Sequence, residues 1–353
     1  MIKAVILAQD RYDSFYGKTA HGLVKFSKKY EIAGVIDSML AGRDAGKVLD
    51  GINRNIPIVA SLSEALSLAP DIKALIIGVA NAGGILPEDY YPFINEAMGK
   101  GMDIVNGLHM FLSDDPYFCG LAHRYGVKLI DVRKLFNNLR ISFSGKIREV
   151  TSQKVAVIGT DGIIGKRTTA ISIYESFQKR NIKTSFVSMG QTGWMQGFDH
   201  AIVLDSIVLD FVTGAIEDMI WKAWKEDEPE VIVTHGEGAM LHPSDPGGFE
   251  LLAAAKPEHV ILQYASERKT YALFPEYEMA KLDRELKLIE AFDGKKPTAI
   301  TLYTKELSKG AALKKAKEIE SQYNILTRVP YYEGVDDIVS KIWGSITPSA
   351  NLV

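Results

Sequence analysis

The residues best suited to chemistry lie in the segment VAVIGTDGIIGKRTTAISIYESF, which begins at Val155. An apolar strand leads into a loop, Gly159–Gly165, that holds three glycines, and Lys166 follows before a helical pattern opens. Glycines let backbone N–H groups turn inward, and a helix N-terminus offers unsatisfied donors and a positive dipole to an anion. We therefore predict a phosphate-binding loop in which Lys166 adds a positive charge. The expected ligand contacts are Gly159, Thr160, Asp161, Gly162, Gly165, Lys166, Arg167, Thr168 and Thr169.

Phosphate loops usually work with magnesium, held by a hydroxyl directly after the lysine and by an acid at the end of a neighbouring strand. Arg167 stands in the place of that hydroxyl, so Thr168 or Thr169 would have to take its role. Two segments offer candidate acids: VIVTHGEG, at 231–238, holds Glu237, and VLDSIVLDF holds Asp205 and Asp210. Any of these acids could instead cap a helix or lie in a solvated turn. We expect the metal ligands to be Thr168, Asp205 and Asp210.

The segment GQTGWM, residues 190–195, follows a predicted strand, where substrate loops of such sheets lie. Gln191 and Thr192 could hydrogen-bond a carboxylate or an amide, and Trp194 could form a wall of the pocket. A buried tryptophan in a tight turn is the structural alternative. We predict that these three residues contact a small-molecule substrate.

A second loop, HGEGAMLHP at residues 235–243, leaves the predicted strand Val231–Thr234 and should emerge at the same sheet edge as the phosphate loop. A turn at Gly238 could aim Glu237 and His242 at one substrate, and either side chain could carry a proton. Alternatively, the glycines only ease packing and the histidine caps a helix. The predicted catalytic residues are Lys166, Glu237 and His242.

Short β-rich runs alternate with longer helical patterns along the chain, which is typical of βαβ units. We predict an α/β fold of two doubly wound parallel-sheet domains, a Rossmann-like domain at 1–150 and a P-loop nucleotide-binding domain at 151–353. The expected strands are Ala4–Leu7, Ile32–Ile36, Ala74–Val79, Asp103–Val105, Lys128–Ile130, Val155–Ile158, Thr184–Val187, Val231–Thr234, Val260–Gln263, Ala299–Leu302 and Ile325–Val329. The expected helices are Gly22–Tyr30, Tyr91–Gly99, Thr169–Lys179, Val208–Trp224, Met279–Phe292 and Ala311–Tyr323.

The first domain lacks the GxGxxG fingerprint of a nicotinamide site, offering AQDRYDSFYGKTAHG after its first strand instead. Gly17–Thr19, at a helix start, forms a second possible anion site. The segments NAGG, at 81–84, and NGLH, at 106–109, follow strands where a ligand crevice would lie, and His109 is their one residue for polar chemistry. The alternative is a domain that only shapes or dimerises the enzyme.

The composition of the chain limits which partners it can bind and in which compartment it can work. The chain has 41 basic and 44 acidic residues and a net charge of −3, which does not favour nucleic acid as a partner. Cys119 is the only cysteine, so an intrachain disulfide is excluded and a reducing compartment fits. No apolar stretch reaches about 18 residues, and the N-terminal apolar run is shorter than a signal-peptide core. We expect a cytoplasmic homo-oligomer without a membrane partner.

The motifs resemble known families. GTDGIIGK, at residues 159–166, is similar to the GTDTxxGK loop of dethiobiotin synthetases and their P-loop relatives. Over nearly the whole chain, the sequence resembles a two-domain family, formerly of unknown function, that joins a Rossmann-like domain to a P-loop domain and includes the DgcN-type N-acetyltransferases of D-glutamate catabolism. The segments that carry this resemblance are GKTAHGLVKF, VIDSMLAGRDAG, IIGVANAGGILP, NGLHMFLSDDP, DVRK, GQTGWM, LDFVTGAIED and GEGAMLHP. Relatives usually show an EGQG-like sequence where this chain has HGEG, so His235 stands in the acidic place.

These observations leave three functions open. An enzyme could bind ATP with magnesium and activate a small amino-acid-like carboxylate, with Lys166, Arg167 and the loop amides stabilising charge. The family resemblance implies instead acetyl transfer from acetyl-CoA to the amine of a D-amino acid such as D-glutamate, with His242 or Glu237 as base. A nucleotide-gated switch or metallochaperone is the third. One cysteine and seven scattered histidines disfavour soft-metal delivery.

Overall fold

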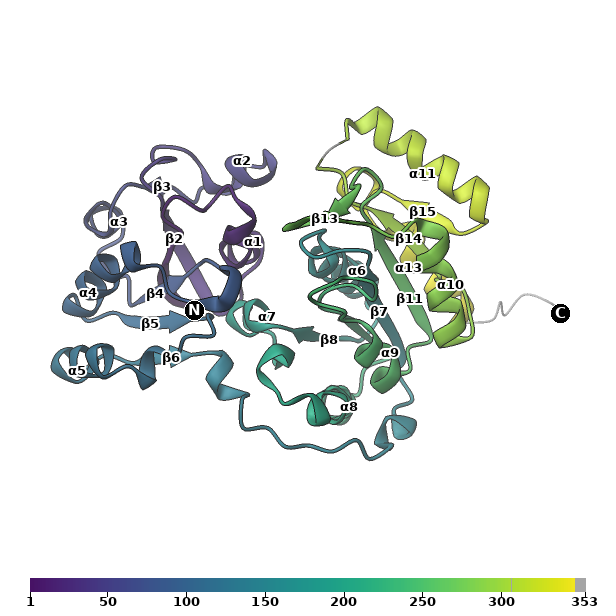
Figure 1. Cartoon of the computed structure of the whole chain (residues 1–353), viewed down its shortest axis with the longest axis horizontal. Coiled ribbons are helices and arrows are strands. Elements are labelled where there is room, and N and C mark those ends of the chain that lie inside the picture. Colours follow the sequence, from purple (N-terminus) through teal and green to yellow (C-terminus); the bar gives the residue numbers. More distant parts are fainter. Residues whose placement is uncertain (306, 347–353) are drawn as a thin grey trace. The chain divides into compact units, whose positions relative to one another are not determined.

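The computed structural model describes residues 1–305 and 307–346 of the chain (Figure 1). These residues divide into two compact units. The first unit holds Met1–Leu139 together with Gly190–Val208, and the second holds Arg140–Met189 together with the described residues from Leu209 onward. The stretch 190–208 therefore counts with the first unit although it lies beyond the boundary expected near residue 150.

The first unit contains a sheet of six parallel strands in the order β3-β2-β1-β4-β5-β6. Its central strands are near-continuous apolar runs, as expected of a parallel sheet that is covered on both faces, and residues 4–7 and 75–77 are fully buried. The strand order reverses between β1 and β4, which is where doubly wound sheets open a crevice for ligands. The strands are β1 (Ile2–Leu7), β2 (Tyr30–Ile36), β3 (Ile58–Val59), β4 (Ala74–Ile77), β5 (Asp103–Asn106) and β6 (Leu129–Asp131).

The helices of the first unit, labelled in Figure 1, begin and end at residues that suit those positions. The Ser61 side chain accepts the N–H of Glu64 at the start of α3, and Asp115 accepts the N–H of Tyr117 at the start of α5. Gly126 ends α5 in the left-handed conformation. The helices are α1 (Lys18–Lys25), α2 (Ala45–Asp50), α3 (Leu62–Leu68), α4 (Tyr91–Gly99), α5 (Pro116–Tyr125) and α7 (Gln191–Gln196).

The second sheet has seven strands in the order β15-β14-β11-β7-β10-β8-β9. β7 is central and pairs in parallel with β10 and β11. A separate antiparallel pair, β12 (Thr270–Tyr271) and β13 (Phe274–Glu278), follows β11. The sheet strands are β7 (Gln153–Gly159), β8 (Thr184–Met189), β9 (His200–Ile202), β10 (Val231–His235), β11 (His259–Tyr264), β14 (Ala299–Leu302) and β15 (Leu326–Arg328).

The helices of the second unit alternate with these strands. Ser176 donates to Asp336 at 2.6 Å and thereby ties α6 to α13. Ser308 caps α11 by accepting the N–H of Ala311, and Asn324 ends that helix in the left-handed conformation. The helices are α6 (Lys166–Lys179), α8 (Leu209–Asp227), α9 (Phe249–Ala255), α10 (Leu282–Asp293), α11 (Lys309–Tyr323), α12 (Pro330–Glu333) and α13 (Asp336–Ile346).

The predicted fold class is confirmed, since both units are α/β with parallel sheets. The expected helix Gly22–Tyr30 is wrong in extent: α1 begins at Lys18, and residue 30 already belongs to β2. The short strands β3 and β9 and the pair β12–β13 are not among the predicted strands. Strands of two or three residues carry too few side chains to show an alternating or continuous apolar pattern.

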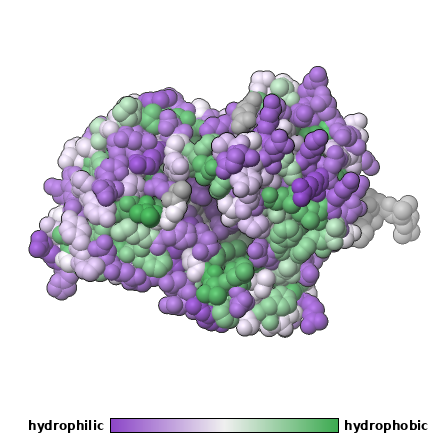
Figure 2. All heavy atoms as spheres, viewed as in Figure 1, coloured by the Kyte–Doolittle hydropathy of each residue, from purple (hydrophilic) through white to green (hydrophobic). Residues whose placement is uncertain are grey.

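Hydrophilic residues cover much of the face drawn in Figure 2, and hydrophobic residues form smaller patches there. The apolar side chains of the second sheet lie in the interior instead: Val155 and Val157 of β7 and Ile261 and Leu262 of β11 are fully buried. None of the helices within residues 1–305 and 307–346 is long and apolar enough to span a membrane.

Candidate functional site

The phosphate loop joins the central strand β7 to helix α6 at the carboxyl edge of the second sheet. β7 lies between β10 and β11, so the loops after these strands surround its end. The loop turns through Ile163 (φ 56°) and Gly165 (φ 88°), and α6 begins at Lys166. A Cβ at Gly159 would lie 2.8 Å from Cδ of Lys166, so a larger residue there would displace that side chain. This turn presents the first amides of α6 to the loop, an arrangement that suits an anion.

Lys166 connects the phosphate loop to the loop that follows β10. Its buried ammonium donates to the backbone oxygens of Asp161 and Gly238, at 2.6 Å each. Gly238 belongs to the segment HGEGAMLHP. The phosphate loop and the segment that holds Glu237 and His242 therefore form one site, as expected from their common sheet edge.

Asp161 is the charged centre of the phosphate loop and is fully buried. Its carboxylate accepts the N–H of Gly162 at 2.6 Å and of Ala272 at 3.0 Å. Arg268 donates to the same carboxylate at 2.6 Å and neutralises its charge. Arg268 is not predicted from the sequence, and no spacing indicates it, because it lies 107 residues from Asp161 along the chain.

His242 packs directly against this carboxylate. Its Nδ1 accepts the N–H groups of Ser244 (3.2 Å) and Asp245 (3.1 Å), so the proton of the neutral ring is on Nε2, which lies 3.5 Å from Oδ1 of Asp161. The rings of Tyr271 and Phe274 meet the imidazole edge to face. Burial lowers the pKa of His242, only partly offset by Asp161 and Asp245. His242 is thus a neutral, fixed side chain beside the phosphate loop.

Arg167 and His235 form a second pair at this edge. Nη2 of Arg167 donates to the backbone oxygen of Met189 at 2.8 Å, and its Nε donates to Nε2 of His235 at 3.3 Å. The other ring nitrogen of His235 lies 3.3 Å from the oxygen of Gly236. Burial and then the nearby Arg167 hold the pKa of His235 well below its ordinary value. Burial lowers the pKa of Arg167 too, and the charge of Glu237 opposes that shift.

The two threonines that open α6 differ in their surroundings. Thr169 is buried and donates to Oε1 of Gln263 at 2.7 Å, which also accepts the hydroxyl of Thr301 at 2.6 Å. Thr169 thereby fixes α6 to β11, and this bond engages its hydroxyl proton. Thr168 is exposed.

The expected metal ligands Thr168, Asp205 and Asp210 belong to two different units. Asp205 belongs to the first unit, where Arg133 binds its carboxylate at 2.6 and 3.1 Å. Thr168 and Asp210 belong to the second unit, and Asp210 is exposed in the first turn of α8. No group of three or more His, Cys, Asp or Glu side chains suited to a metal occurs in the described part of the chain. Magnesium usually keeps several waters and binds substrate phosphates besides one or two carboxylates, so its binding by these residues stays a prediction.

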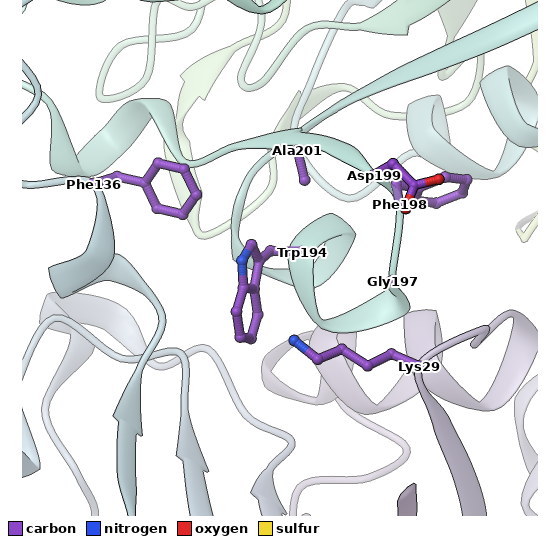
Figure 3. A pocket seen from close by; sticks show the side chains of 7 residues that line it. All are labelled: Lys29, Phe136, Trp194, Gly197, Phe198, Asp199 and Ala201. Carbon is purple, nitrogen blue, oxygen red and sulfur yellow. The ribbon is translucent and has the colours of Figure 1, made fainter. Parts of the chain in front are cut away.

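The predicted substrate residues lie on α7, within the first unit. Gln191 and Thr192 are buried, and Thr192 donates to Oγ1 of Thr19 at 3.4 Å. Trp194 lines a cavity of about 410 Å³, where the Lys29 ammonium lies 3.2 Å from the centre of its ring (Figure 3). Gln191 and Thr192 therefore pack into the unit, whereas Trp194 faces a cavity. Their contact with substrate stays a prediction.

The chain is similar to known proteins over most of its length. The D-glutamate N-acetyltransferase of Tritonibacter scottomollicae is 28% identical over 300 residues, which cover 83% of this chain and 88% of that protein. A protein of the same name from a Pseudoalteromonas species is 29% identical over 209 residues, covering 59% of this chain and 60% of that protein. The crystal structure of a DUF1611 family protein from Anabaena variabilis ATCC 29413 matches with a TM-score of 0.88 and 28% identity, over 97% of this chain and 99% of the other.

Family models match both halves of the chain. Residues 38–135 match a Rossmann-like domain described as a domain of unknown function, DUF1611_N. Residues 141–339 match a P-loop domain described as a domain of unknown function, DUF1611_C. The family resemblance inferred from the motifs is confirmed, and the chain belongs to the DUF1611 family.

Proposed function

We propose that this chain transfers an acetyl group from acetyl-CoA to the amine of an acidic D-amino acid such as D-glutamate. The observation that carries the proposal is the likeness to the D-glutamate N-acetyltransferase of Tritonibacter scottomollicae, which covers 83% of this chain and 88% of that protein. The 300 matched residues exceed the P-loop domain at 141–339, so the likeness extends beyond a shared phosphate loop.

The phosphate loop suits the phosphate groups of acetyl-CoA. The first amides of α6 and the cations Lys166 and Arg167 can bind an anion without metal ligands. Arg167 is held at its place by the backbone of Met189 and by His235. When bound, acetyl-CoA would supply the acyl group as a thioester.

Acetyl transfer to an amine needs a base, and a residue of the site must supply it. The reaction forms an amide N–C bond, breaks the thioester C–S bond and releases a proton from the amine. Both ring nitrogens of His242 are engaged, Nδ1 by two backbone N–H groups and Nε2 by Asp161. Glu237 lies next to Gly238, which binds Lys166, and its charge acts on Arg167. We therefore assign proton removal to Glu237 and a positioning role to His242.

Phosphoryl transfer from ATP to a small carboxylate is the second candidate function. The glycine loop with Lys166 at the start of α6 favours it, because this arrangement is typical of nucleotide-binding sites. The likeness to the two D-glutamate N-acetyltransferases favours acetyl transfer over this candidate.

A product assay separates the two functions. The purified full chain is incubated with acetyl-CoA and D-glutamate, L-glutamate or D-alanine, and free CoA is measured with a thiol-reactive dye. Cys119 is exposed and would react with the dye, so the Cys119→Ser variant is the matched background control. Parallel samples contain ATP and magnesium with the same amino acids, and ADP and phosphate are measured.

We expect CoA release that depends on D-glutamate and needs neither ATP nor magnesium. Release of ADP or phosphate that depends on the amino acid, without CoA release, would replace this proposal by phosphoryl transfer. If no sample releases CoA, ADP or phosphate, both enzyme functions are contradicted.

A further inference from the structure

The first unit holds a cavity of about 380 Å³ that the proposed chemistry does not use. Its lining comes from the start of α1 (Lys18), from the loop after β4 (Asn81 and Gly84) and from the loop after β5 (His109). β1 and β4 are the strands between which the order of the sheet reverses. The position is that of ligand crevices in doubly wound sheets, and the volume lies in the range of small-molecule sites.

Two cations and one carboxylate line this cavity. Arg133, in the short helix Arg133–Leu135, donates from Nε and Nη2 to the two oxygens of Asp205, at 3.1 and 2.6 Å. The Arg133 side chain is 7% exposed, whereas that of Asp205 is 37% exposed. The guanidinium thus fixes the carboxylate from the buried side. Lys18 is exposed and contributes the second positive charge.

His109 completes the polar lining. Its backbone N–H donates to the oxygen of Gly84 at 2.9 Å, and a Cβ at Gly84 would lie 2.5 Å from Cδ2 of the imidazole, so glycine is required for this packing. Nε2 of His109 lies 3.7 Å from Oδ2 of Asp205. Burial, and then the charges of Arg133 and Lys18, lower the pKa of His109 despite Asp205. The ring is therefore neutral near pH 7 and offers hydrogen bonds without adding charge.

We infer that this cavity binds an acidic amino acid, with Lys18 and Arg133 facing its two carboxylates and Asp205 facing its ammonium group. The charges match one to one, two cations and one anion in the cavity against two anions and one cation in the ligand. A guanidinium has five donors, so the pair with Asp205 still allows Arg133 to bind a carboxylate. The inference rests on the charges of the first unit and not on the proposed acetyl transfer.

The test is binding of D-glutamate to the full chain without acetyl-CoA, measured by calorimetry. Lys18→Gln and Asp205→Asn should each weaken binding about tenfold or more, because each removes one charged partner. Lys100→Gln and Asp71→Asn are matched controls at exposed positions of the same unit, outside its cavities, and should leave the affinity unchanged. L-glutamate serves as a second probe for the configuration.

Glutarate tests the role of Asp205 separately. It has both carboxylates but no ammonium group, so it should bind more weakly than glutamate to the wild type. Asp205→Asn should remove that difference. Glutarate that binds the wild type as well as glutamate does would overturn the assignment of Asp205.

The inference is overturned if neither glutamate nor glutarate binds, or if Lys18→Gln and Asp205→Asn bind like the controls. The unfolding midpoint of each variant, measured without ligand, shows whether the variant is folded. If Asp205→Asn proves unstable, Lys18→Gln alone tests the inference, because Lys18 is exposed and its replacement should not affect folding. CoA release is measured independently, so binding without acetyl transfer contradicts only the proposed function.

Discussion

The two sheets carry different kinds of polar site at their carboxyl edges. In the second unit, Lys166 and Asp161 are buried and fixed by backbone groups and by Arg268. In the first unit, the side chains of Asp205 and His109 are 37% and 49% exposed. The site in the second unit is therefore held in one geometry before a ligand binds, whereas the side chains in the first unit can adjust to a ligand.

The difference has an electrostatic consequence. Ion pairs away from water lose little strength to screening, but a charge left there without its partner is costly. Ion pairs near the surface contribute little and cost little to break. Matched substitutions in the two units should therefore give unequal effects.

The largest difference is expected for the two arginines that hold aspartates. Arg268→Met leaves Asp161 charged and fully buried, so the free energy of unfolding should fall by about 3–5 kcal/mol. Arg133→Met leaves Asp205 in partial contact with water, so its loss should be about 1 kcal/mol. Urea unfolding of both variants measures the two values.

A double variant identifies the cause of the first loss. Replacing Asp161 by Asn in the Arg268→Met background removes the uncompensated charge and should recover much of the stability. Equal losses in Arg268→Met and Arg133→Met, or a double variant no more stable than Arg268→Met, would contradict the distinction drawn between the two sites.

The next effect concerns turnover in the second unit. Glu237→Gln removes the proposed base, so kcat of acetyl transfer should fall by about 10²-fold or more. His242→Gln disturbs a positioning residue and should raise KM more than it lowers kcat. Glu290→Gln, at an exposed position of α10, is the matched control. If His242→Gln lowers kcat as much as Glu237→Gln does, with KM unchanged, the two roles are assigned the wrong way round.

The phosphate-loop lysine should affect binding more than stability. Lys166→Ala removes one cation from the loop, so affinity for acetyl-CoA should fall about 10- to 100-fold, the range for a hydrogen bond to a charged group. Lys179→Ala, at the exposed end of the same helix, should bind like the wild type. Titration calorimetry compares them, and unchanged affinity in Lys166→Ala would remove the phosphate loop from the acetyl-CoA site.

Sequence alone revealed the phosphate loop because its parts are contiguous: strand, glycines, Lys166 and helix follow one another within residues 153–179. The fold class followed from the same local periodicity. Arg268 could not be predicted, because only the fold brings it to Asp161. Lys18 and His109, which the sequence indicates as candidates for a ligand site, both line the first-unit cavity. Asp205 lines it too, although the sequence alone favours it as a magnesium ligand, because an acid after a strand suits either role.

The smallest expected effect is a pH dependence of stability that His235 introduces. Burial holds the pKa of this side chain well below its ordinary value of about 6.5, so the unfolded chain takes up a proton that the folded chain excludes. The stabilisation is complete above about pH 6.5 and decreases as the pH falls below it, by at most about 1.4 kcal/mol per pH unit for one proton.

His235→Gln tests this dependence, since glutamine can still accept hydrogen bonds from Arg167 and the N–H of Met189 but does not titrate. Other buried histidines, such as His242, contribute in both proteins, so the measured quantity is the difference between the two stability curves from pH 7 to pH 5. The wild type should lose more stability than the variant over this range. His109→Gln should change the curve less, because the His109 side chain is 49% exposed and its pKa is lowered less strongly. Parallel curves for the wild type and His235→Gln would mean that His235 accepts a proton in the folded chain as readily as in the unfolded one.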